Sequence, residues 1–331
     1  MLSRLKIALC ILLLTLLLTA LHLLTNQLSF ESYLHSRLIT LSSFSPSYVN
    51  ALLSAPDPRS DFNFTFPNTT HPIPRKIHFI WFRDLYPDTS RPSHIPSSGS
   101  HAPARCLLFN PHFTHQIWNA TSARDLLSTH YPWFLPVYDA YPHPIQRVDA
   151  FKYFLLYHHG GVYLDMDVAC RRNLDPLLDF GAWWPKARPW GVNNDVMAAT
   201  KGHPLLRRMM ERLQARNRRW GSTWWTVWWS TGPGFAGDML GEWWREGRGM
   251  DEGDAEIRVL PEAFYSEQYT FFGHSPGGTW YGSDVMVITW IVDRVWIFLS
   301  LFAVLGMGYA FFVWRRSTRS GRRMSLIKSW V

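Results

Sequence analysis

The stretch that most constrains the fold of this chain is residues 160–167, which begin with two glycines and end in an Asp-x-Asp pair. Residues 162–164 are apolar or aromatic and predict a short buried strand. Asp165 and Asp167 follow it one residue apart, and in an extended chain residues i and i+2 point to the same face. The sequence therefore predicts two neighbouring carboxylates at the end of a strand.

A helix is expected directly before this strand, over residues 147–159. Its apolar residues recur at helical spacing. They include Val148, Phe151, Phe154 and Leu155. Gly160 then predicts the helix end, because glycine tolerates the backbone conformation that terminates helices. Open α/β sheets bind ligands at the carboxyl ends of their strands, so a ligand is expected at the aspartates.

The aspartate pair predicts a metal site. Two like charges so close together are costly unless a cation lies between them. Carboxylate oxygens suit Mg²⁺ and Mn²⁺, which also hold substrate phosphates. The leading hypothesis is a metal that binds the diphosphate of a nucleotide-sugar. The alternative is a chance Asp-x-Asp pair in a solvated turn.

The net positive charge of the chain comes from its two ends, because basic and acidic residues balance between them. The formal net charge is +8, and eight basic residues flanking two apolar runs account for all of it. They are Arg4, Lys6, Arg315, Arg316, Arg319, Arg322, Arg323 and Lys328. The body between them is formally neutral, so the basic balance does not indicate nucleic-acid binding.

The two apolar runs predict a membrane topology. Residues 7–24 and 295–314 are each long enough to span a bilayer, although a cleaved signal peptide is an alternative for the first. Basic residues next to both runs place both termini in the cytosol. The expected parts are a cytosolic N-terminus (1–6), a signal anchor (7–24), a lumenal stem (25–73), a folded domain (74–290), a transmembrane helix (295–314) and a basic cytosolic tail (315–331).

The stem is polar, rich in Ser and Pro and without lasting periodicity. Glycosylation triplets at Asn63, Asn68 and Asn119 agree with a lumenal body. In that oxidising compartment Cys106 and Cys170 either pair or remain free, since their spacing does not decide.

The folded domain alternates strand-like and helix-like segments. Strands are expected at 77–81, 113–119 and 192–199, and helices at 122–130 and 204–219, with Ser122 as the cap of the first. This alternation predicts an α/β domain with a largely parallel sheet. Three Trp pairs, at 224–225, 228–229 and 243–244, fit sugar stacking, a membrane interface or the core.

Several segments in the same order resemble glycosyltransferase family 32, the DXD sugar-binding group. The similar segments are 74–81, 147–157, 160–167, 194–197, 231–234 and 272–280, within a resemblance that covers roughly residues 74–284. They look most like the fungal subgroup that mannosylates inositol phosphorylceramide, which also carries a trailing transmembrane segment.

The resemblance implies a GT-A-like fold, which is a Rossmann-like mixed sheet flanked by helices, here with a transmembrane helix at each end. It also implies Mn²⁺ or Mg²⁺, GDP-mannose as donor, retention of anomeric configuration and a sphingolipid acceptor. An accessory membrane subunit accompanies some relatives. Location in the Golgi or endoplasmic reticulum membrane, with a lumenal catalytic domain, follows from the same likeness.

The resemblance also assigns residue roles. Asp165 and Asp167 correspond to the metal and diphosphate motif, with His274 near the metal or diphosphate. The donor is expected to contact Trp81 at the base, Arg147 and Asp149 at the sugar and ribose, and Asn194 and Asp195 at the reacting sugar. One departure is Tyr281, where the family often has His.

The expected reaction is metal-dependent hexosyl transfer. A carboxylate, Asp149 or Asp195, would stabilise the oxocarbenium-like sugar, while the aspartate-bound metal stabilises the leaving diphosphate. Two alternatives remain at this point: a mannosyltransferase acting on protein N-glycans, and a non-catalytic membrane scaffold or regulatory subunit.

Overall fold

The computed structural model describes most of the chain between residues 2 and 315. The described residues are 2–55, 64, 70–82, 102–249, 253, 255–265, 271–274, 283–295, 297, 300–301, 304–309, 311–312 and 315, with only the backbone described at 2–10, 12–13, 274, 289 and 292. Two compact units are distinguished, Met1–Trp280 and Tyr281–Val331.

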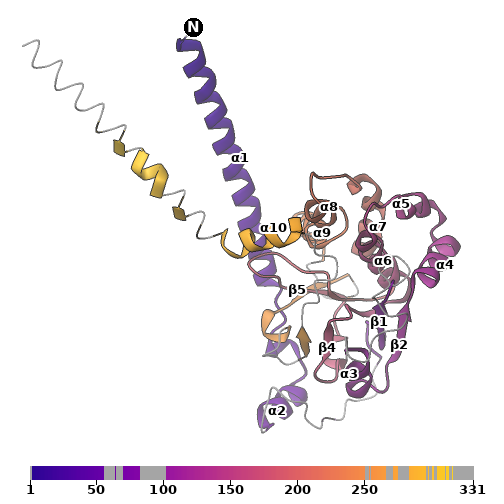
Figure 1. Cartoon of the computed structure of the whole chain (residues 1–331). Helices are drawn as coiled ribbons and strands as arrows, with labels where there is room; N and C mark the ends of the chain where they lie inside the picture. The colour runs from indigo at the N-terminus through magenta and orange to yellow at the C-terminus, as the bar shows by residue number, and fades with distance from the viewer. Residues whose placement is uncertain are drawn as a thin grey trace, which may run out of the picture. The chain divides into compact units, whose positions relative to one another are not determined.

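A six-stranded mixed sheet forms the centre of the first unit, in the order β2-β1-β3-β6-β5-β7 (Figure 1). Its strands are β1 (Lys76–Ile80), β2 (Thr114–Trp118), β3 (Gly161–Leu164), β5 (Ala182–Pro185), β6 (Val196–Ala199) and β7 (Ile257–Leu260). β6 is antiparallel to both of its neighbours, and the other pairs are parallel. The expected α/β class is therefore correct, with one reversed strand in the middle of the sheet.

Helices surround this sheet in the first unit. They are α1 (Leu2–Ser36), α2 (Pro46–Ser54), α3 (Ala102–Phe109), α4 (Ala120–His130), α5 (Leu135–Asp139), α6 (Pro144–His159), α7 (Pro204–Arg216), α8 (Thr223–Ser230) and α9 (Pro233–Arg245), with short 3-10 turns at 41–43, 132–134, 175–177 and 262–264. A two-stranded sheet pairs β4 (Val168–Cys170) with β8 (Phe272–His274). In the second unit the structure describes α10 (Ser283–Asp293).

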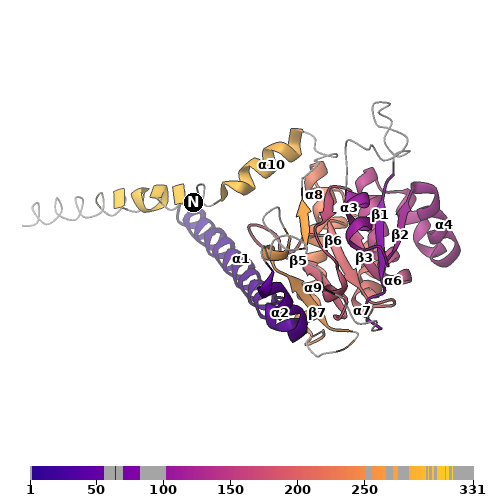
Figure 2. The ribbon, with the colours of Figure 1, turned by 90° about the horizontal axis from the view of Figure 1, so that it is seen from below.

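Both faces of the central sheet are buried. Tyr163 and Met197 point into the core formed with α6, α7 and α9, whereas Val162 and Val196 point into a second core with α2 and α3. Figure 1 shows α6, α7 and α9 above the sheet and α2 and α3 below it, and Figure 2 is the view from below. This double burial explains why β3 reads as a continuous apolar run.

Some predicted boundaries shift. The helix expected at 122–130 begins at Ala120, because Asn119 caps it through a 2.8 Å bond from the Ser122 amide to Asn119 Oδ1. The strand expected at 192–199 begins only at Val196, and the helix expected at 204–219 ends at Arg216.

The described part of the predicted stem, residues 25–55, 64 and 70–73, packs on the folded domain, unlike a polar stem without periodicity. Phe30 of α1 packs on Trp244 of α9, with ring centroids 5.9 Å apart. Glu31 Oε2 lies 2.8 Å from Lys186 Nζ. The Ile39 amide donates to the Val259 carbonyl at 2.8 Å, which fastens the segment beside β7. The difference arises because widely spaced apolar residues become core only through tertiary contacts.

Within the side chains that are described, no helix combines the length and the hydropathy needed to cross a bilayer. For the predicted span at 7–24, some side chains are not described. For the predicted span at 295–314, many residues are not described. Asn63, Asn68, Tyr281, the loop 275–280 and the tail 316–331 also lie outside the described residues.

Candidate active site

Two glycines bring the aspartate loop into position. Gly160 ends α6 with φ +64°, and Gly161 begins β3 with φ +104°, both in the region that favours glycine. A Cβ on Gly161 would lie 2.7 Å from the Lys76 carbonyl oxygen of β1. The chain can thus pass from α6 into the sheet only with no side chain at this point.

The Asp-x-Asp pair lies in a turn between β3 and β4, so the extended geometry expected for it is wrong. The turn closes through the Val168 amide, which donates to the Asp165 carbonyl at 3.0 Å. Asp167 nevertheless remains near Asp165. Burial raises the pKa of the Asp165 carboxyl group most, and the charge of Asp167 raises it further. The two carboxylates are therefore neighbours by virtue of the turn.

Asp165 is held by three groups. Its backbone amide donates to the Asp195 carbonyl at 2.7 Å. Its carboxylate accepts a hydrogen bond from the Tyr163 hydroxyl and lies 3.1 Å from Lys152 Nζ. The side chain remains 32% exposed. One face of this carboxylate is thus fixed by the protein while part of it is open to a ligand.

Lys152 is a central site residue that the sequence analysis missed. It is only 2% exposed, and its Nζ lies 3.0 Å from Asp149 Oδ1 as well as 3.1 Å from Asp165. Burial alone would lower the pKa of Lys152, but the two carboxylates hold that pKa above its ordinary value. The available signal was a lysine in the most apolar part of a helix, three residues after an aspartate.

Asp149 and Asn194, two of the predicted site residues, are in direct contact. Asp149 is 4% exposed and accepts from Asn194 Nδ2 at 3.1 Å and from Thr231 Oγ1 at 3.4 Å. Burial raises the pKa of Asp149, and the charge of Lys152 opposes that rise. Tyr153 braces Thr231 by donating to its carbonyl at 2.7 Å. Side chains from α6, from the residues just before β6 and from the α8–α9 junction thus surround the Asp149 carboxylate.

Asp195 faces a different partner. Its Oδ2 accepts from Asn193 Nδ2 at 2.7 Å and from the hydroxyl of Tyr265, a residue that the sequence analysis did not single out. Burial and the Asp195 carboxylate raise the pKa of the Tyr265 hydroxyl. Asp195 joins the Asp149 cluster through its backbone carbonyl, which accepts from the Asp165 amide.

The remaining predicted residues border this cluster. Arg147 lies on another face of α6 from Asp149, and its Nη2 donates to the Asp139 carbonyl at 3.1 Å. Trp81 directly follows β1, the strand between β2 and β3, and its amide donates to the Trp118 carbonyl of β2 at 2.7 Å. The His274 backbone pairs with Val168, the residue after Asp167, while its side chain lies outside the description.

A disulfide anchors the far end of the aspartate loop. Cys106 of α3 is bonded to Cys170 of β4, which answers the pairing question left open by the sequence. Cys170 lies three residues after Asp167, so α3 and the β4–β8 pair hold the loop between them. The strand carrying the His274 backbone is thereby fixed next to the aspartates.

The donor set fits a hard cation. Asp165 and Asp167 offer carboxylate oxygens, and Mg²⁺ or Mn²⁺ is often bound by one or two carboxylates together with substrate phosphates. Across the described residues no group of three or more His, Cys, Asp or Glu side chains gathers as a complete protein cage. Two neighbouring carboxylates thus fit a metal that also binds substrate phosphates.

Comparison with known proteins agrees with this geometry. The model of the "Glycosyltransferase sugar-binding region containing DXD motif" matches residues 96–184. Inositol phosphoceramide mannosyltransferase 3 of Schizosaccharomyces pombe is 33% identical over 269 residues, covering 78% of this chain and 72% of that protein. This chain belongs to the DXD glycosyltransferase family.

This transferase is also similar to a second curated protein and to one solved structure. Mannosyl phosphorylinositol ceramide synthase SUR1 of Saccharomyces cerevisiae is 30% identical over 276 residues, covering 82% of this chain and 68% of its own length. Among solved structures, the PaToxG glycosyltransferase aligns with 51% of this chain and 69% of its own, at 16% identity and a TM-score of 0.40.

Proposed function

We propose that this transferase moves mannose from GDP-mannose to inositol phosphorylceramide, with retention of configuration, in sphingolipid biosynthesis. The observation that carries the proposal is the likeness to enzymes named for mannosyl transfer to this lipid, over about four fifths of the chain. The buried Asp149–Lys152–Asp165 cluster supports it, because a strongly perturbed charged cluster at a strand end is typical of a catalytic site.

At the diphosphate end, Asp165 and Asp167 would hold Mn²⁺ or Mg²⁺. A bound divalent ion stabilises the negative charge of a departing diphosphate. Lys152 lies against the same Asp165 carboxylate and keeps one of its oxygens oriented. The protein thus fixes one ligand in advance, which lowers the entropic cost of assembling the donor complex.

At the sugar end, Asp149 is the group that we assign to the developing positive charge. Asn194, Thr231 and Lys152 orient its oxygens. A carboxylate in a water-poor surrounding interacts more strongly with an oxocarbenium-like centre than it would in water. We assign Asn194 and Asp195 to the reacting sugar, Arg147 to the donor sugar and ribose, Trp81 to the base, and His274 to the diphosphate.

The proposed enzyme has a GT-A-like domain held at a membrane. The apolar runs at 7–24 and 295–314 support two spans with cytosolic ends and a lumenal catalytic domain. Large apolar side chains of α1, including Ile11 and Leu28, are each at least 50% exposed, as a lipid-facing helix requires. We place the enzyme in the Golgi or endoplasmic reticulum, and an accessory membrane subunit is part of this proposal.

The test is mannosyl transfer by the full-length chain in detergent. We expect transfer from GDP-mannose to inositol phosphorylceramide that requires Mn²⁺ or Mg²⁺, is abolished by EDTA, and falls at least ~1000-fold in Asp165→Asn. Asp125→Asn, at an exposed carboxylate of α4, is the matched control and should keep its activity. Transfer only to an N-glycan acceptor would refute the lipid assignment, and GDP binding without any transfer would favour a scaffold.

A further inference from the structure

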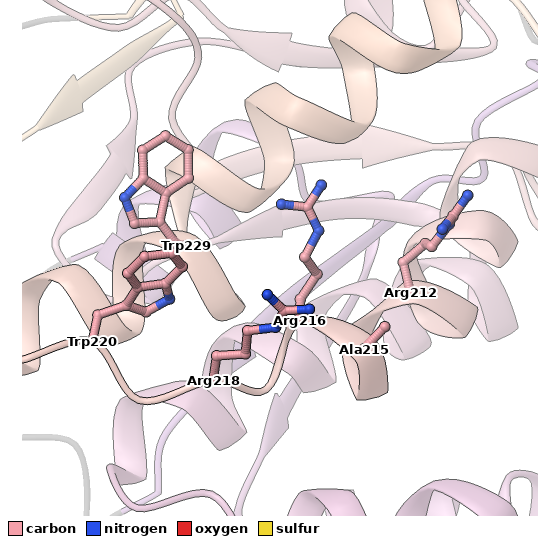
Figure 3. Close-up of a pocket in the computed structure, with 6 residues that line it drawn as sticks. All are labelled: Arg212, Ala215, Arg216, Arg218, Trp220 and Trp229. Carbon is pink, nitrogen blue, oxygen red and sulfur yellow. The ribbon is translucent and has the colours of Figure 1, made fainter. Parts of the chain in front are cut away.

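A basic and aromatic groove lies outside the cluster described above. Six residues line it: Arg212, Ala215, Arg216, Arg218, Trp220 and Trp229, from the last turns of α7, the connection after it and α8. Its volume is about 480 Å³. The two tryptophans lie at one end of the groove and Arg212 at the other (Figure 3). Nothing in the proposed donor chemistry uses these residues.

The topology places this groove on the same edge of the fold as the donor cluster. α6 runs from Asp149 near its start down to Gly160, and the Gly202 amide, just before α7, donates to the Tyr157 carbonyl at 2.8 Å. α7 packs on α6 and therefore returns toward the edge where Asp149 lies. α8 then leads from the groove to Thr231, which donates to Asp149.

The separation suits a two-part substrate site. α8 has eight residues, so it spans about 12 Å along its axis. Trp229 lies two residues before Thr231, so the tryptophan end of the groove is the end near the donor cluster, and Arg212 lies at the far end. A molecule bound in the groove can therefore present one end to the sugar donor.

The groove is preformed by local hydrogen bonds and ring packing. Thr226 is 4% exposed, and its Oγ1 accepts from the Trp220 amide at 2.9 Å. Ser222 caps α8 by accepting from the Trp225 amide at 3.2 Å. The Trp225 and Trp229 rings are nearly parallel, at an interplanar angle of 3°. These contacts fix the connection so that Trp220 is held in place although it is 46% exposed.

The charge of the groove is only partly compensated. Arg216 lies 2.9 Å from Asp238 and 3.4 Å from Glu242, which ties α7 to α9. Arg212 and Arg218 are exposed, and within the described part of the chain neither forms an ion pair. The groove therefore offers two guanidinium groups to an anion. Guanidinium groups bind phosphate oxygens in bidentate fashion.

We propose that this groove binds the phosphate-bearing headgroup of the lipid acceptor. Arg212 and Arg218 bind the phosphate, and Trp220 and Trp229 pack against the cyclitol ring. Indole suits this role because it has a broad apolar face and a polar N–H group that can face water. The inference rests on the proposed function for the identity of the acceptor. The positive groove and the acidic phosphodiester are complementary in charge, and the ring faces the donor cluster.

The test compares Arg212→Gln/Arg218→Gln with wild type, using full-length protein and mixed micelles of defined composition. The matched control is Arg207→Gln, an exposed arginine earlier on α7. We expect the double variant to raise KM for inositol phosphorylceramide at least ~10-fold, because two charge-assisted contacts are lost. The KM for GDP-mannose and transfer to free myo-inositol, which lacks the phosphate, should remain within twofold of wild type.

Direct binding separates this inference from the proposed function. Immobilised protein is exposed to micelles with and without inositol phosphorylceramide, without donor. If wild type binds the lipid and the double variant does not, but no mannose is transferred, the groove assignment is supported and the proposed function is refuted. If transfer occurs and the double variant keeps the KM of Arg207→Gln, the groove assignment is overturned. It is also overturned if the variant loses only stimulation by added phosphatidylserine, which would indicate a general membrane contact.

Discussion

Replacing Lys152 with methionine tests whether the buried lysine holds the acidic cluster together. Methionine keeps the approximate volume but removes the charge that lies 3.0 Å from Asp149 and 3.1 Å from Asp165. Breaking a buried ion pair costs about 3–5 kcal/mol, because a charge is left without compensation. Asp165 is 32% exposed, so water screens its part of the interaction and the lower end applies. We expect a loss of about 3 kcal/mol.

The assay is unfolding of the detergent-solubilised chain, followed by intrinsic fluorescence. For a domain of this size, 3 kcal/mol lowers Tm by roughly 6–12 °C. Lys201→Met, at an exposed lysine, is the control and should remain within ~0.5 kcal/mol of wild type. Lys152→Arg keeps the charge and should recover part of the stability.

A second readout couples this loss to metal binding. In Lys152→Met the aspartates lack their cation, so Mn²⁺ should bind more favourably and raise Tm by more than it does in wild type. The reasoning is refuted if Lys152→Met unfolds at the temperature of Lys201→Met. It is refuted also if saturating Mn²⁺ shifts both proteins equally.

Three further predictions concern stability. Burial lowers the pKa of His78 to about 3, so below pH 6.5 the unfolded state binds a proton that the folded state does not, and the free energy of unfolding falls. Between pH 7 and 5 the wild type should lose about 2 kcal/mol more of this free energy than His78→Gln, and equal losses would contradict this. Removing the disulfide with Cys106→Ala/Cys170→Ala, which opens a loop of sequence separation 64, should cost about 4 kcal/mol in denaturant unfolding, and a loss below ~1 kcal/mol would contradict the chain-entropy argument. Gly161→Ala should cost about 3 kcal/mol by the same assay, whereas Gly202→Ala, with nothing within 4 Å of its Cβ, should cost only about 1; equal costs would mean that the backbone of β1 yields.

Local patterns in the sequence predicted the elements around the site. The apolar run before Asp165, the glycines at 160–161 and the alternation in residues 77–81 each report on a few neighbouring residues, and all three became the expected elements. The family resemblance named Asp149 and Asn194 as separate donor contacts, and the structure brings the two side chains within hydrogen-bonding distance. Order along the chain and strand type were therefore accessible without coordinates.

Features that depend on spatial pairing were not accessible. Lys152 becomes a site residue only because α6 and β3 set its distance to Asp165. Tyr265 reaches Asp195 from a segment 70 residues away. The position of β6 between β3 and β5 likewise depends on strand order, which alternation in one segment does not encode. The Asp-x-Asp turn was missed because extended geometry was assumed for three residues beyond Leu164, where β3 ends.

The docking of residues 30–52 onto the central sheet bears on how a soluble version of this enzyme should be cut. A fragment that starts at residue 74, where the family motifs begin, would lack Phe30 and Leu34, and also Tyr48 and Leu52, all of which are buried. It would expose the Trp244 surface of α9 that Phe30 covers, and parts of both cores. Exposed apolar surface promotes aggregation. A fragment starting near Gln27 keeps them, so the minimal folding unit is about 45 residues longer than its motifs.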